Sequence, residues 1–283
     1  MTIFQDLRTW RFWRHFLTRS FACLGGLSMV LQTSNVINPT VKAFEGMPVL
    51  ILVIVASLVG GLIWSWPRSI TQDYSAPKTR ITIVKGNMLD ETTHLVIGTN
   101  DTFDTETPVI ISRESLQGQA LQALYGGDLK ELDAQLAVAL ADKPTVGTIA
   151  KAGKQTRYGV GTIATVKHTA RLIFFLAYCE MDAHNTARST PDKVWKSLLL
   201  LWDEVSKKAN GGTVSIPVIG GGQARVSSVL PAQDAIRLTL LSYMFASRSE
   251  KVCDELRIVV RPRDFKKLDR LELQSFLSSL RSS

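Results

Sequence analysis

The sequence predicts an α/β domain, a three-layer sandwich around a buried mixed sheet, preceded by a hairpin of two transmembrane helices. Three observations carry this prediction. An uncharged, mostly apolar run of twenty residues, Met47–Trp66, follows a basic segment. From residue 81 to about 260, short apolar runs typical of buried strands alternate with stretches of helical spacing. The net charge of +8 lies outside this second region, whose basic and acidic side chains cancel.

These observations divide the chain into four parts. Residues 1–67 hold the basic segment and the two transmembrane helices, residues 68–80 form a linker, residues 81–260 form the α/β domain, and residues 261–283 form an amphipathic tail. The tail docks either on the domain or on the membrane surface, and the sequence does not decide between them. A nucleic-acid-binding protein carries its positive surplus on the folded domain, so we expect no nucleic acid partner.

The run Met47–Trp66 predicts a membrane-spanning helix. Twenty residues at about 1.5 Å each cross a hydrocarbon core of about 30 Å. Trp64 and Trp66 stand where aromatic side chains anchor at the membrane interface, and Pro67 ends the run.

The earlier stretch Ser20–Ile37 predicts the first span, although it contains the polar residues Gln32–Asn35. An interfacial segment and a signal peptide are the alternatives, but no small-x-small cleavage site follows and a second span comes at once. Basic residues precede the first span and follow the second, so the positive-inside rule places both termini and the domain in the cytoplasm. The polar face either assembles several hairpins or belongs to a plain anchor.

The elements of the domain follow from its apolar runs and breakers. Strands are predicted at 81–84, 94–98, 159–164, 172–176, 214–219 and 256–260, and helices at 115–124, 129–140, 191–208 and 231–246. The three cysteines are far apart and the four histidines are scattered, so neither a disulfide framework nor a metal site is predicted.

Three consecutive glycines, Gly220–Gly222, end the apolar run Val214–Ile219, and a helical pattern follows from about Ser228. Because glycine lacks a Cβ atom, its backbone can lie directly against a phosphate, and a helix start adds partial positive charge. A flexible αβ turn is the alternative interpretation.

Four motifs in this order resemble a macro domain over roughly residues 80–260. They are Val84-Lys85-Gly86-Asn87, Leu95-Val96-Ile97-Gly98-Thr99-Asn100, Ser115-Leu116-Gln117-Gly118 and Ile216-Pro217-Val218-Ile219-Gly220-Gly221-Gly222. The chain departs from the family at Asn87, where macro domains carry an adenine-binding Asp. It departs again at Gly98–Asp101 in place of an Asn-Ala-Ala-Asn-like turn, and at the first phosphate loop, which Ser115–Gly118 replaces. Together with the membrane hairpin, the chain resembles the membrane-anchored macro-domain effectors of type II Thoeris antiphage defence.

The resemblance implies an ADP-ribose-type ligand and a set of binding residues. Asn87 is expected at the adenine, and Asn100, Asp101 and Asp104 at the distal ribose with Phe103 covering that end. Ser115 and Gly118 offer backbone amides opposite the second phosphate loop. That loop contributes Val218, Ile219, Gly220, Gly221, Gly222 and Gln223.

The resemblance also implies a role in defence at the bacterial inner membrane. A TIR-domain partner makes an ADP-ribose derivative, the domain binds it, and the chain forms homo-oligomers that disrupt the lipid bilayer and kill the infected cell. We expect no enzyme activity, no catalytic residue, no metal and no cofactor beyond this ligand. The alternatives are a membrane-tethered macro-type ADP-ribosyl hydrolase, with Asn100 or Asp101 positioning water, and a structural membrane protein.

Overall fold

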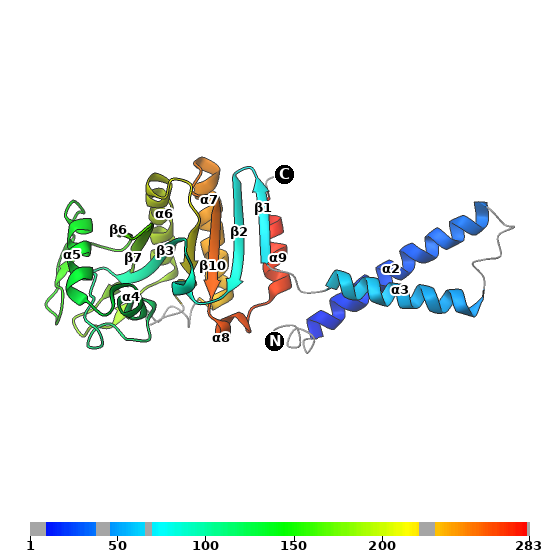
Figure 1. The fold of residues 1–283 in the computed structure, drawn as a ribbon, viewed down its shortest axis with the longest axis horizontal. Helices are drawn as coiled ribbons and strands as arrows, with labels where there is room; N and C mark the ends of the chain where they lie inside the picture. The colour runs from blue at the N-terminus through cyan, green and yellow to red at the C-terminus, as the bar shows by residue number, and fades with distance from the viewer. Residues whose placement is uncertain (1–9, 38–45, 66–69, 221–229, 282–283) are drawn as a thin grey trace. The chain divides into compact units, whose positions relative to one another are not determined.

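A computed structural model of the chain describes residues 10–37, 46–65, 70–220 and 230–281. The chain divides into two units, Met1–Arg68 and Ser69–Ser283, and Figure 1 labels the helices and strands of each. Each unit is described by itself.

The first unit is a pair of helices packed side by side, α2 (Trp10–Ile37) and α3 (Met47–Ser65). The residues that α3 buries against its partner recur at every fourth position, which keeps them on one helix face: Val53, Ser57, Gly61 and Ser65. A Cβ atom on Gly61 would lie only 2.9 Å from the Cα of Ser20 on α2. The two helices approach closely at Gly61, because only a residue without a side chain fits there.

Among the described residues, α3 is the one helix long and apolar enough to cross a membrane, with a mean hydropathy of 2.5. Its large apolar side chains, such as Ile51 and Leu52, are mostly exposed in the structure. This helix supports the second predicted span on length and composition only. The first span, over Ser20–Ile37, forms a helix as expected, but its place in a membrane stays a prediction.

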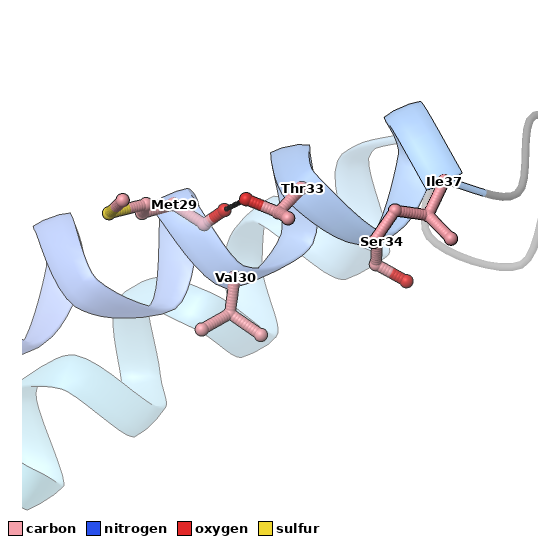
Figure 2. Close-up of a pocket in the computed structure, with 5 residues that line it drawn as sticks. All are labelled: Met29, Val30, Thr33, Ser34 and Ile37. Atoms are coloured by element: carbon pink, nitrogen blue, oxygen red, sulfur yellow. Dashed lines mark hydrogen bonds between the residues drawn. The ribbon is translucent and has the colours of Figure 1, made fainter.

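One polar side chain of α2 has its hydrogen-bonding partner within the same helix. Figure 2 shows a shallow hollow on this helix, lined by Met29, Val30, Thr33, Ser34 and Ile37. The Thr33 hydroxyl donates a 2.8 Å hydrogen bond to the carbonyl of Met29, one turn earlier. A hydroxyl satisfied by its own helix can face lipid without a polar partner, so the assembly of hairpins cannot be argued from Thr33.

The second unit is built on one mixed sheet, in the order β1-β2-β10-β9-β3-β7-β6, with β8 added beside β7. The central strands β2 (Lys78–Lys85), β10 (Glu255–Val260), β9 (Val214–Pro217), β3 (His94–Asn100) and β7 (Arg171–Met181) run parallel. The outer strands β1 (Ile70–Ser75), β6 (Ile163–His168) and β8 (Ala187–Arg188) pair antiparallel. A separate pair, β4 (Gly147–Thr148) and β5 (Thr156–Arg157), lies apart from this sheet.

Helices cover both faces of the sheet (Figure 1). One face packs against α6 (Pro191–Lys208), α7 (Ala232–Ser249) and α9 (Arg270–Ser279), with Trp202 and Tyr243 fully buried at its centre. The other face packs against α4 (Leu116–Tyr125) and α5 (Leu129–Leu140). Short helices η2 (Met88–Asp90) and α8 (Pro262–Phe265) complete the unit. The predicted three-layer sandwich with a mixed sheet is confirmed.

The predicted linker 68–80 is wrong for most of its length. Residues 70–75 form β1, the edge strand, which pairs with the first residues of β2. The strand escapes prediction because it reads Ile-Thr-Gln-Asp-Tyr-Ser, and only Ile70 and Tyr74 supply apolar side chains to the buried face. Its partner begins with the polar run Lys78-Thr79-Arg80.

The tail, which the sequence left undecided, docks on the domain. Helix α9 contacts β1 and α7, and its Leu273 and Leu277 are fully buried in the larger core. The hydroxyl of Tyr74 on β1 donates a 2.6 Å hydrogen bond to the Leu277 carbonyl. Two segments outside the predicted domain therefore complete it, β1 before it and α9 after it.

The other elements differ from prediction mainly at their ends. The strand expected at 159–164 begins at Ile163, because Gly159 and Gly161 adopt positive φ angles of 82° and 99°. The helix predicted at 231–246 begins at Ala232 and continues to Ser249.

Candidate functional site

The predicted ligand residues gather at one edge of the sheet. Asn87 follows β2, Asn100 ends β3, and Val218 follows β9. These strands belong to the parallel part of the sheet, so their carboxyl ends share an edge, where α/β folds bind ligands. Gly221, Gly222 and Gln223 lie outside the described residues.

The start of the glycine loop makes a turn that only glycine adopts readily. Gly220, three residues after the end of β9, has a φ angle of +87°, a conformation in which a Cβ atom is strained. Ile219, by contrast, is buried in the larger core. Its side chain is committed to packing, so only its backbone can serve a ligand, and its place among the ligand residues stays a prediction.

Asn100 is held by its side-chain oxygen. Its Oδ1 accepts hydrogen bonds from the Thr102 backbone N–H (3.0 Å), the Thr102 hydroxyl (2.9 Å) and the Asp104 backbone N–H (3.2 Å). This Asx-type arrangement fixes the amide plane. Among the described residues, nothing accepts a hydrogen bond from its Nδ2, so the donor end of the amide points away from the loop. We call residues 100–105 the site loop.

Asp101 does structural work in the site loop. Its Oδ2 lies 2.6 Å from the Arg157 Nε, and its Oδ1 accepts a 2.9 Å hydrogen bond from the Met181 backbone N–H. The side chain is 1% exposed. Because the carboxylate is paired inside the protein and closed off from solvent, the predicted ligand role of Asp101 is wrong.

Asp104 is equally committed, to a lysine that the sequence analysis did not single out. Both carboxylate oxygens lie 2.8 Å from the Lys151 Nζ, and Oδ1 also accepts a hydrogen bond from the Lys154 backbone N–H at 2.9 Å. The Lys151 and Asp104 side chains are 0% and 1% exposed. The predicted contact of Asp104 with the ligand is therefore wrong, because its carboxylate is closed off from solvent.

Phe103 is a core residue. Its ring is fully buried in the smaller core and makes an edge contact with Tyr158, with ring centroids 5.7 Å apart. Its φ of +52° is unusual for a residue with a side chain. The sharp turn places the ring inside the domain, which contradicts its predicted role as a cover for the pocket.

The amides at the start of α4 are used by the protein itself. The Ser115 backbone N–H donates to the Ser112 carbonyl at 3.1 Å, and the Gly118 N–H donates to the Ser115 hydroxyl at 3.0 Å. Ser115 is thus the N-cap of this helix. Gly118 is required by close packing, since a Cβ there would lie 3.0 Å from the Arg113 Cα. Both predicted donations to a ligand are wrong.

Comparison with known proteins identifies the family. A family model described as the macro domain of the Thoeris protein ThsA matches residues 81–261. The chain belongs to the ThsA macro domain family. The macrodomain of Oceanobacillus iheyensis with ADP is similar in structure, with a TM-score of 0.50 and 15% identity, over 76% of this chain and 98% of that chain. A mutant of the same macrodomain with ADPR has a TM-score of 0.50 and 15% identity, over 75% and 98%. No curated protein matches the chain.

The family match does not cover the whole second unit. It begins at Ile81 and ends at Arg261, so it leaves out β1 and α9, which complete the sheet and the larger core here. At this low identity, the two solved structures show a shared fold.

Asn87 of this ThsA macro domain stands at the predicted place but bonds to its own neighbours. Its Oδ1 accepts a hydrogen bond from the Leu89 N–H at 3.3 Å, and its Nδ2 donates to the Asp90 carboxylate at 3.0 Å. Because Asn87 is exposed, these bonds exchange readily with water or a ligand. Its contact with an adenine ring stays a prediction.

Sequence reasoning missed a segment that grips the site loop of the ThsA macro domain. We call residues 151–158 the clamp segment. It contributes the partners of three loop residues, namely Lys151 for Asp104, Lys154 for the Phe103 carbonyl (2.9 Å) and Arg157 for Asp101. Three basic residues within seven positions are a visible signal, but their partners lie about fifty residues away and no spacing rule connects them.

No group of three or more His, Cys, Asp or Glu side chains that could hold a metal ion is found within the described ranges. The hollows on α2 and α3 contain none of the predicted ligand residues. The chemistry of the described site therefore rests on backbone donors and one free amide.

Proposed function

We propose that this ThsA macro domain binds an ADP-ribose-type nucleotide at the carboxyl edge of β2, β3 and β9. The family match over residues 81–261 carries the proposal. Solved macrodomains of the same fold with ADP and with ADPR support it. Two features of the site have suitable chemistry, the positive-φ turn at Gly220 and the Asn100 Nδ2, which has no acceptor within the described part of the chain.

Each feature matches one part of such a ligand. A glycine turn after a strand exposes consecutive backbone N–H groups, which bind diphosphate oxygens. An amide N–H group donates to the hydroxyl oxygen of a ribose. The ligand is thus recognised largely by donors, as a dianionic diphosphate with ribose hydroxyls requires.

We propose further that the domain binds its ligand without catalysing a reaction on it. The two carboxylates of the site loop next to Asn100 are held by Arg157 and Lys151, so neither is available as a general base for water. Burial raises the pKa of the nearby Cys179 thiol to about 12, which keeps it protonated and unreactive at neutral pH.

Incubation of the full-length protein with ADP-ribosylated protein is expected to leave the modification intact over hours. Mass spectrometry of the substrate measures this result. Cleavage that disappears in Asn100→Ala would replace this proposal with the macro-type hydrolase.

The helical hairpin would link ligand binding to an effect on the membrane. We propose that a TIR-domain partner supplies the nucleotide, that binding drives assembly of several chains, and that their hairpins then disrupt the inner membrane. The apolar helix α3 supports the membrane part, and the basic residues flanking the hairpin support a cytoplasmic domain and cytoplasmic termini.

Replacing Gly220 with valine is expected to abolish binding. A β-branched residue at a φ of +87° is strained, so the turn at residue 220 is expected to change its backbone conformation. Calorimetry on the full-length protein in detergent measures the affinity for ADP-ribose, with wild type binding and Gly220→Val showing at least a tenfold loss, about 1.4 kcal/mol.

Gly211→Val is the matched control. Gly211 also has a positive φ, +76°, but it precedes β9 at the opposite edge of the sheet. It is expected to cost stability without changing affinity. A folded Gly220→Val protein with wild-type affinity would remove the glycine loop from the site.

A further inference from the structure

The ion pair between Lys151 and Asp104 is fully buried, and burying two charges costs free energy. Moving two charges out of water carries a desolvation penalty that their attraction offsets only with good geometry and further hydrogen bonds. Those bonds are present. The Lys151 Nζ also donates to the Ala152 carbonyl at 3.0 Å, so each of its three N–H groups has an acceptor. The pair is fully satisfied and therefore rigid.

The backbone at Gly153 packs closely against this ion pair. Gly153 lies beside it with a φ of +81°, and a Cβ atom there would lie 2.7 Å from the Asp104 Oδ1. The backbone of the clamp segment thus approaches the carboxylate more closely than any residue with a side chain permits. Such an approach brings the Lys154 N–H within 2.9 Å of the same oxygen.

A short path leads from this pair to the free amide of Asn100. The Asp104 carboxylate accepts hydrogen bonds from the Lys151 Nζ. The Asp104 backbone N–H donates a hydrogen bond to the Asn100 Oδ1 at 3.2 Å. The Thr102 hydroxyl joins both, since it lies within hydrogen-bonding distance of the Asn100 Oδ1 and the Asp104 Oδ2. Whatever fixes Asp104 therefore also fixes the oxygen end of the Asn100 amide, and with it the direction of Nδ2.

We propose that Lys151 is a positioning residue for ligand recognition, acting through Asp104 to aim the Asn100 Nδ2 at a hydroxyl of the distal ribose. This inference rests on the proposed function, because it assigns one part of the bound nucleotide to one part of the site. Lys151 itself touches no ligand, since its side chain is fully buried. The diphosphate is assigned separately, to the turn at Gly220.

Comparing the binding of two nucleotides distinguishes the diphosphate part of the site from the distal-ribose part. ADP carries the adenosine and the diphosphate but lacks the distal ribose of ADP-ribose. The test variant is the double substitution Lys151→Met/Asp104→Asn, which removes both buried charges together and so avoids an unpaired one. An asparagine at 104 still accepts a hydrogen bond from the Lys154 N–H, but the ammonium that fixed the carboxylate is gone.

The control is Lys143→Met. Lys143 is also a lysine in an ion pair, with the Glu204 carboxylate 3.7 Å away, and its side chain is 29% exposed. It lies outside both the site loop and the clamp segment, so the substitution leaves the contacts of Asp104 in place. Affinities of the full-length protein for ADP and for ADP-ribose are measured by calorimetry in detergent, with circular dichroism as the check on folding.

The double variant is expected to bind ADP-ribose about tenfold more weakly and ADP as tightly as wild type, while the control changes neither affinity. Tenfold corresponds to about 1.4 kcal/mol, the size of one hydrogen bond. A merely structural role would weaken both nucleotides together, and that result, like an unchanged ratio of affinities, overturns the inference. Failure of the wild type to bind either nucleotide instead contradicts the proposed function.

Discussion

Replacing Lys151 alone with methionine is expected to lower the free energy of unfolding of the domain by about 3–5 kcal/mol, the range measured when one partner of a buried ion pair is removed. The Asp104 carboxylate, 1% exposed, would lose its cation and stay in the interior. Methionine matches the length of lysine without its charge, so the loss reflects electrostatics rather than a cavity. A domain held together by about 5–15 kcal/mol loses a large share of its stability this way.

The measurement is urea unfolding of the full chain in detergent, monitored by hydrogen exchange of the domain's amides. Lys154→Met, whose ion pair is partly exposed, is expected to cost under about 1 kcal/mol. The double variant Lys151→Met/Asp104→Asn is expected to recover most of the loss, because no charge is left unpaired. If the single and double variants were equally unstable, the charge argument would be wrong.

Vesicles containing the full-length protein are expected to leak a trapped dye only when ADP-ribose-type ligand is present, an all-or-none difference. A ligand drives such a change only by favouring the assembled state over the free one. Light scattering in detergent is expected to show a matching shift from small to large species. Leakage without ligand, or an unchanged size at saturation, would contradict the proposed output.

Two variants separate sensing from leakage. Deleting residues 1–68 removes the first unit and keeps β1, so the remainder is expected to bind ligand without causing leakage. Gly220→Val keeps the hairpin and is expected to do neither. Leakage caused by the deletion variant would show that the membrane effect does not come from α2 and α3.

The sequence predicted the fold well wherever apolar periodicity was strong. Helices α5 and α6 were predicted with the observed bounds, 129–140 and 191–208, because each presents a continuous apolar stripe to the sheet. Strand β1 was missed for the opposite reason. An edge strand with one covered face needs few apolar residues, and Gln72 fills a buried position that a pattern assigns to a loop.

The site was predicted by location rather than by contact. Asn100 and Gly220 keep the predicted positions, since the end of a strand and a glycine run can be read directly. Asp101 and Asp104 were assigned to the ligand because they follow the end of a strand, where α/β folds bind ligands, whereas here they pair with Arg157 and Lys151. Those partners depend on tertiary packing across about fifty residues, which no local pattern contains.

The contact between β1 and α9 also orders events during synthesis. Tyr74 meets Leu277, a partner 203 residues later in the chain, so this contact cannot form until the ribosome has made those residues. Domains fold from the amino terminus as they emerge, and by then α2 and α3 have already left the ribosome. The packing of α9 against β1 therefore forms late. Until then β1 lacks this cover and is available to chaperones or to a neighbouring nascent chain.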